Sequence, residues 1–125
     1  MTVKRGEIYW VEFSPTKGSE QSGLRPALVV QNDVGNRFSP TTVVVAITRT
    51  IPPKPYPFVV VIDPEESGLP ARSAVICAQM ATIQQTGPDS RLRPPAGSSV
   101  VQAIGLLDPR TMAEVDVAIA FHLGL

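Results

Sequence analysis

The chain has 125 residues, 43% of them hydrophobic, and its 11 basic and 11 acidic side chains leave no formal net charge. This length predicts one domain, residues 1–125, which can bury a core without help from disulfides. A globally basic nucleic-acid-binding surface is excluded, so any contact with a polyanion has to come from a local patch.

Cysteine content and hydropathy indicate the cellular compartment in which the protein is expected. The single cysteine, Cys77, lies in an apolar run with no histidine or lysine beside it, so it is interpreted as a small core residue rather than a nucleophile. The chain shows no signal peptide and no apolar segment near the ~20 residues that span a bilayer. The sequence therefore predicts a soluble cytoplasmic protein.

Strand signals dominate the first two thirds of the chain. Runs rich in β-branched and aromatic residues predict strands at 7–13, 27–31, 41–48, 58–62 and 73–83. Segments rich in Gly, Pro, Asn and Ser predict loops or turns at 14–23, 32–40, 52–57, 63–70 and 84–98. Residues 100–107 fit either a short strand or a turn of helix.

One helix is predicted near the end of the chain. Asp108 suits the N-cap, Pro109 suits the first helical position, and Gly124 follows the last periodic residue. Apolar residues recur at helical spacing at Met112, Val115, Ile119 and Leu123. Several strands followed by one helix, with no βαβ alternation, predict a mainly β fold, a small and mostly antiparallel barrel.

Polar side chains that suit polyanion recognition gather at loops and strand ends. Pro26 biases Arg25 toward an extended backbone, which places a forked, permanently charged guanidinium where a buried strand begins. The candidates are Ser19, Glu20, Gln21, Arg25, Thr48 and Gln79, with arginine for phosphate and the others for base edges. An ordinary solvated arginine at a strand end is the alternative interpretation of Arg25.

Other chemistries find little support. The only histidine, His122, lies near the end of the predicted helix, and no Asp, Glu, Cys or His cluster has metal-ligand spacing. A Ser-His-Asp triad and a glycine-rich phosphate loop are equally unsupported. His122 is therefore interpreted as a surface or interface residue.

Four ordered blocks closely resemble the MazF/PemK family of toxin endoribonucleases, also called mRNA interferases. They are Lys4–Tyr9, Gly18–Asp33, Asn36–Thr41 and Ala46–Thr48, and the likeness thins to Ser73–Ile76, Gln79 and Thr82–Ile83 further on. The resemblance implies an SH3-like small β-barrel (CcdB/MazF/PemK-like) with a C-terminal α-helix, assembled as a homodimer. It also implies the toxin of a type II toxin-antitoxin system, with a MazE-like antitoxin as partner.

The resemblance further implies sequence-specific cleavage of single-stranded RNA without a metal or other cofactor. The substrate's own 2'-hydroxyl would be the nucleophile, giving 2',3'-cyclic phosphate and 5'-hydroxyl ends. By this likeness Arg25 and Thr48 are the catalytic pair, and the RNA is positioned by Ser19, Glu20, Gln21 and Gln79. A guanidinium stays protonated near neutral pH, so Arg25 suits an electrostatic clamp rather than a general base, and Glu20 is an open candidate for proton transfer.

The chain departs from the family pattern in places that bear on RNA preference. Ala81 stands before Thr82-Ile83, where family members commonly carry a basic residue, and segments 52–57 and 84–98 are rich in proline. Two alternative functions stay open: a CcdB-like toxin that binds DNA gyrase, and an inactive RNA-binding barrel. CcdB-like proteins carry a tryptophan close to the C-terminus, whereas the only tryptophan here is Trp10.

Overall fold

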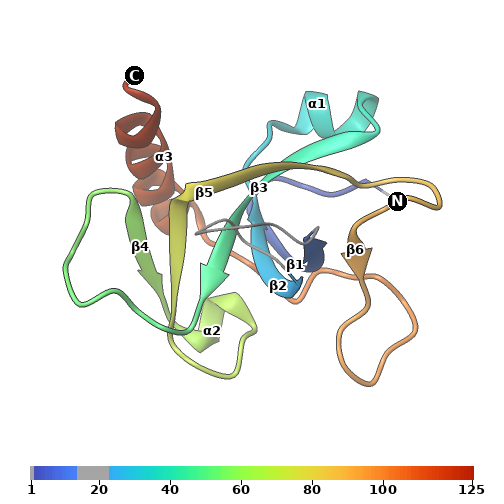
Figure 1. The fold of residues 1–125 in the computed structure, drawn as a ribbon, viewed down its shortest axis with the longest axis horizontal. Helices are drawn as coiled ribbons and strands as arrows, with labels where there is room; N and C mark the ends of the chain where they lie inside the picture. The colour runs from blue at the N-terminus through green and yellow to red at the C-terminus, as the bar shows by residue number, and fades with distance from the viewer. Residues whose placement is uncertain (1, 14–22) are drawn as a thin grey trace.

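The computed structural model describes residues 2–13 and 23–125. Within these ranges seven strands form one antiparallel sheet in the order β4-β5-β3-β2-β1-β6, with β7 paired to β1, and three helices accompany it (Figure 1). The strands are β1 (Glu7–Phe13), β2 (Gly23–Val29), β3 (Thr41–Thr48), β4 (Val59–Ile62), β5 (Ser73–Gln84), β6 (Leu92–Arg93) and β7 (Gly105–Leu106). The helices are α1 (Asp33–Phe38), α2 (Pro64–Ser67) and α3 (Pro109–Leu123).

The central strands are buried on both faces. Side chains alternate along a strand, so Ile8, Leu28 and Val45 enter one core cluster while their neighbours Tyr9, Val29 and Val44 enter a second. This double burial explains why the strand sequences read as continuous apolar runs instead of alternating ones. The predicted strands at 41–48 and 73–83 are confirmed as β3 and β5, the latter one residue longer.

A bulge bends β5 and curves the sheet. Val45 of β3 pairs with Met80 but its neighbour Ala46 pairs with Ile76, so three residues of β5 have no partner on β3 at this point. Beyond the bulge, the first half of β5 also pairs with β4. Figure 1 shows β5 turning sharply partway along its length. The described sheet is a half-barrel with a C-terminal helix, which confirms the predicted fold class.

Helix α3 forms as its sequence predicts. The Asp108 side chain accepts a hydrogen bond from Thr111 N at 2.9 Å, and Gly124 takes the left-handed conformation that closes the helix (φ 73°). Val115 and Ala118 are buried in the first core cluster. No helix in residues 2–13 and 23–125 is long and apolar enough to cross a membrane.

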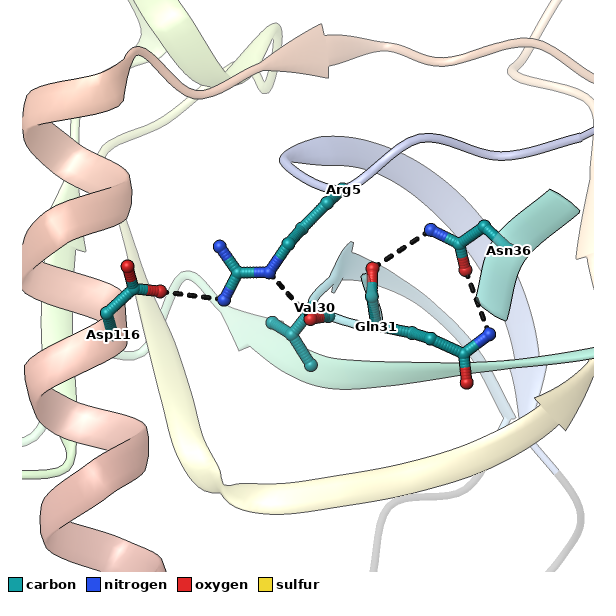
Figure 2. Close-up of polar contacts among 5 residues, drawn as sticks. All are labelled: Arg5, Val30, Gln31, Asn36 and Asp116. Carbon is teal, nitrogen blue, oxygen red and sulfur yellow. Dashed lines mark hydrogen bonds and ion pairs between the residues drawn. The ribbon is translucent and has the colours of Figure 1, made fainter. Parts of the chain in front are cut away.

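The prediction of a loop at 32–40 is wrong, because α1 lies inside it. Asn32 caps this helix by accepting a hydrogen bond from Gly35 N at 2.8 Å. Asn36 is 2% exposed, and its amide donates to Gln31 O at 2.9 Å (Figure 2). A Cβ on Gly35 would lie 3.1 Å from the Gln31 side chain, so the absence of a side chain at this position leaves room for Gln31, four residues earlier.

Smaller differences concern the ends of elements. Strand β2 begins at Gly23 and ends at Val29 rather than covering 27–31, which places Arg25 within the strand instead of at its entrance. The predicted turn at 63–70 contains α2, and the predicted loop at 84–98 contains β6. Within residues 100–107 the only regular element is the two-residue strand β7 (Gly105–Leu106).

Arg5 joins three parts of the fold. Its Nε donates to Val30 O at 2.7 Å, just after β2, and its Nη2 contacts Asp116 Oδ1 of α3 at 2.7 Å (Figure 2). Its backbone N–H donates to Asp33 Oδ1, also at 2.7 Å, and this bond is the largest of the influences that lower the pKa of Asp33. The turn before β1 is thereby held against both α1 and α3.

Candidate active site

Arg25 and Thr48 lie at the same end of neighbouring strands. Strands β2 and β3 pair through Ala27 and Ala46, and continuing that antiparallel register by two residues brings Arg25 opposite Thr48. Both residues line one cavity of about 290 Å³. Arg25 is exposed and Thr48 is half-buried, so a phosphate in the cavity mouth can reach the guanidinium and the hydroxyl together.

The hydroxyl of Thr48 is oriented by the backbone that follows it. Thr50 N donates to Thr48 Oγ1 at 3.1 Å, so the oxygen of the hydroxyl is engaged as an acceptor. A hydroxyl that accepts in this way keeps its own O–H for donation to another oxygen. The geometry therefore suits Thr48 as a donor to a phosphate oxygen held beside Arg25.

Apart from Arg25 and Thr48, the cavity lining is mainly apolar and also includes one cationic residue and two hydroxyl-bearing ones. Its lining comprises Trp10, Leu24, Arg25, Pro26, Ile47, Thr48, Arg49, Thr50, Leu69, Pro70, Ala71 and Ser73. The sequence analysis names neither Trp10 nor Arg49 as a site residue. Trp10 packs against the first core cluster and also lines the cavity. Only the folded structure shows that Trp10 and Arg49 line the same cavity as Arg25.

Gln79 lies away from this cavity, in the bulge of β5. It is half-buried, with Ile76 and Met80 as the nearest β5 residues that pair with β3. Ala81, two residues further on, packs against the second core cluster opposite Val44. Gln79 is not among the described residues that line the cavity with Arg25 and Thr48. Its predicted role in positioning RNA stays a prediction.

The other predicted site residues, Ser19, Glu20 and Gln21, lie outside the described residues. Their roles in RNA positioning and proton transfer therefore stay predictions. Across 2–13 and 23–125, no group of three or more His, Cys, Asp and Glu side chains is arranged to hold a metal ion.

Cys77 and His122 are placed as the sequence predicts. Cys77 is fully buried in the first core cluster, and burial raises the pKa of its thiol to about 11, which keeps it protonated near neutral pH. His122 is exposed in the last turn of α3, where a cation complements the helix dipole.

Comparison with known families and proteins places this geometry in context. Residues 4–123 match the model of the PemK-like, MazF-like toxins of type II toxin-antitoxin systems. The chain belongs to this family. It is 40% identical over 125 residues to Endoribonuclease EndoA of Bacillus subtilis (strain 168), a match that covers all of this chain and 97% of that protein.

Solved structures agree with the assignment. An endoribonuclease in complex with its cognate antitoxin from mycobacterial species superposes with a TM-score of 0.72 and 26% identity, covering 98% of this chain and 96% of that one. MazF from Deinococcus radiodurans superposes with a TM-score of 0.73 over 100% of this chain and 99% of that one. The latter is 22% identical and supports the fold alone. The family and fold implied by the sequence resemblance are confirmed.

Proposed function

We propose that this toxin cleaves single-stranded RNA at the end of β2 and β3, with Arg25 and Thr48 in contact with the scissile phosphate. Its class, a toxin endoribonuclease of a type II toxin-antitoxin system, follows from the family and from the 40% identical endoribonuclease. The observation that supports the location is the shared cavity, where register and lining bring a guanidinium and an oriented hydroxyl together.

The reaction proceeds through the substrate's 2'-hydroxyl. The 2'-oxygen forms a bond to phosphorus, the bond from phosphorus to the 5'-oxygen breaks, and the products are a 2',3'-cyclic phosphate and a 5'-hydroxyl. The 2'-hydroxyl gives its proton to a base, and the departing 5'-oxygen gains one. Negative charge grows on the equatorial phosphate oxygens, where a fixed cation and a hydrogen-bond donor stabilise it most.

The roles of the two described residues follow from their chemistry. Arg25 contributes charge and paired N–H donors to the phosphate, and Thr48 contributes one O–H donor. Neither acts as the base, so proton acceptance is assigned to another group, and Glu20 is the candidate. If Glu20 accepts the proton, Glu20→Gln retains RNA binding and loses cleavage. Cleavage at the wild-type rate by Glu20→Gln excludes that role.

The partners follow from the same assignment. A type II toxin is neutralised by a protein antitoxin, and this toxin pairs with a MazE-like partner and forms a homodimer, as expected of the family. An acidic, partly disordered antitoxin segment that folds on contact suits a surface with exposed arginines such as Arg25 and Arg49. We place the pair in the cytoplasm, where the RNA substrate is.

The deciding experiment is cleavage of a long mixed-sequence single-stranded RNA in EDTA. Wild-type protein is expected to cut it at a short sequence and to spare a copy with deoxyribose at the cleaved nucleotide. Arg25→Ala is expected to abolish cleavage, while Arg37→Ala, an exposed arginine on α1 beside a separate cavity, serves as the matched control and retains it. Cleavage that needs a divalent metal, or that persists in Arg25→Ala, contradicts the proposal.

A further inference from the structure

Arg49 is a cation at the candidate active site that the proposed cleavage chemistry does not use. It follows Thr48 directly and lines the same cavity as Arg25. Arg49 is exposed, and within residues 2–13 and 23–125 it takes part in no hydrogen bond or ion pair that would hold it to the fold. Its guanidinium is therefore available to a ligand that enters the cavity mouth.

Other arginines of the described chain are held by partners inside the protein. Arg72, one residue before the lining residue Ser73, contacts Asp63 Oδ1 with its Nε at 3.3 Å. Arg93 donates to two backbone carbonyl oxygens at 2.7 and 2.9 Å. Because the chain has no net charge, attraction of a polyanion depends on local cations, and Arg49 supplies one beside the reacting groups.

The backbone of RNA carries one negative charge per nucleotide. A strand whose scissile phosphate contacts Arg25 and Thr48 therefore brings another phosphate close to the same strand ends. A forked, permanently charged guanidinium is well suited to bind that second phosphate. We propose that Arg49 binds the backbone phosphate next to the scissile one. The inference rests on the proposed function, because the position of the RNA is set by Arg25 and Thr48.

The two arginines would then act on different steps. The neighbouring phosphate keeps the same charge throughout the reaction, so Arg49 stabilises the bound substrate and the transition state equally. Loss of such an interaction raises KM and leaves kcat unchanged. Arg25, in contrast, faces the charge that develops in the transition state, so its loss lowers kcat. Because a phosphate carries no sequence information, Arg49 affects affinity and not the choice of cleavage site.

Steady-state cleavage of an RNA substrate separates these effects. Arg49→Gln is expected to raise KM by about tenfold, with kcat and the cleavage sites unchanged. Arg49→Lys keeps the charge and is expected to stay within about threefold of the wild-type KM. Arg72→Ala is the matched control, because Asp63 already neutralises that cation, and its KM is expected to remain near the wild-type value.

Binding measurements identify the phosphate itself. The probe is an RNA that wild type cleaves, made with deoxyribose at the cleaved nucleotide so that it stays intact. The slope of log Kd against log salt is expected to be smaller by about 0.7 for Arg49→Gln. In two further probes, an uncharged methylphosphonate replaces the phosphate on one or the other side of the scissile linkage. One of these probes is expected to bind wild type about tenfold more weakly and Arg49→Gln with no further loss, since both changes remove the same contact.

The outcomes distinguish this inference from the nuclease function. An Arg49→Gln variant with the wild-type KM overturns the contact, and so does an equal rise in KM for Arg72→Ala. Losses that add fully for both methylphosphonate probes also overturn it, because Arg49 then acts on neither phosphate. In each of these cases wild type still cleaves RNA, so the nuclease function stands. Absence of RNA cleavage by wild type overturns both proposals.

Discussion

Removing the hydroxyl of Thr48 tests the proposed catalytic role of this residue without creating a cavity. Thr48→Val replaces Oγ1 by a methyl group of similar size, so the packing of the half-buried side chain is retained. Two interactions are lost: the donor to the phosphate in the transition state and the acceptor for Thr50 N, 3.1 Å away. The first concerns the reaction and the second concerns the fold, and they have different magnitudes.

Loss of one preorganised donor to developing negative charge lowers kcat by about 10²- to 10³-fold, or about 2.7–4 kcal/mol. Loss of one hydrogen bond to a backbone N–H changes the free energy of unfolding by about 0.5–1.5 kcal/mol. For a chain of this size the second effect shifts Tm by a few degrees, at about 4 °C per kcal/mol. Thr48→Val is therefore expected to remain folded at 25 °C and to lose nearly all activity.

The assay is single-turnover cleavage of an RNA substrate with enzyme in excess, paired with a thermal melt of each variant. Thr48→Ser keeps the hydroxyl and is expected to stay within about tenfold of the wild-type rate, since the donor is preserved. If Thr48→Val is folded and cleaves at close to the wild-type rate, the hydroxyl does not donate to the phosphate and the assignment of Thr48 fails.

Two further predictions concern the scaffold. A Cβ on Gly105 would overlap the backbone carbonyl of Ser67. Gly105→Ala is therefore expected to lower the free energy of unfolding by about 1–3 kcal/mol, measured by urea titration. An unchanged urea midpoint would refute the close approach of β7 and α2. The backbone N–H of Thr111 donates a hydrogen bond to the Asp108 carboxylate and lowers the pKa of that carboxyl in the folded protein. The charged Asp108 cap therefore stabilises the fold above the ordinary carboxyl pKa of about 3.9, and this stabilisation is lost as pH falls through the lower pKa of the folded state. The Tm advantage of wild type over Asp108→Asn should therefore shrink below about pH 4. Asp89→Asn is the matched control, because Asp89 is exposed and its side chain has no hydrogen bond or ion pair within residues 2–13 and 23–125, and an equal change there would contradict the mechanism.

Local sequence signals predict most of this fold, because the residues of most elements favour the same structure that the folded chain adopts there. Strand β3 has eight residues of strong β propensity without a break, and α3 carries its own cap, first-turn proline and closing glycine. Helix α1 escapes prediction for a physical reason. Asn32, Gly35 and Asn36 are turn formers in isolation, and the helix is favoured by contacts from other parts of the chain, because Thr42 and Gln85 both donate hydrogen bonds to the buried Asn36.

The candidate site was predictable in part. Arg25 and Thr48 could be selected from the sequence because each stands at the end of an apolar run, yet their juxtaposition depends on the register of β2 and β3, which no local pattern encodes. The position of Trp10 at the cavity is harder to predict. A tryptophan in a strand is typical of a core, and only the folded structure shows that Trp10 also lines the cavity that contains Arg25.

The placement of the site at a strand end separates catalysis from stability. Ala27 and Ala46 are almost fully buried, whereas Arg25 is exposed and Thr48 is only half-buried, two residues further along the same pair of strands. The buried pairs hold the backbone of Arg25 and Thr48 in a fixed register, so the proposed mechanism requires no reorganisation when charge develops on the phosphate. Substitutions at the exposed ends therefore act on the reaction far more than on the fold. Substitutions at Ala27 or Ala46 that enlarge the side chain are expected to disturb both, because they strain the packed pair on which the alignment of Arg25 and Thr48 depends.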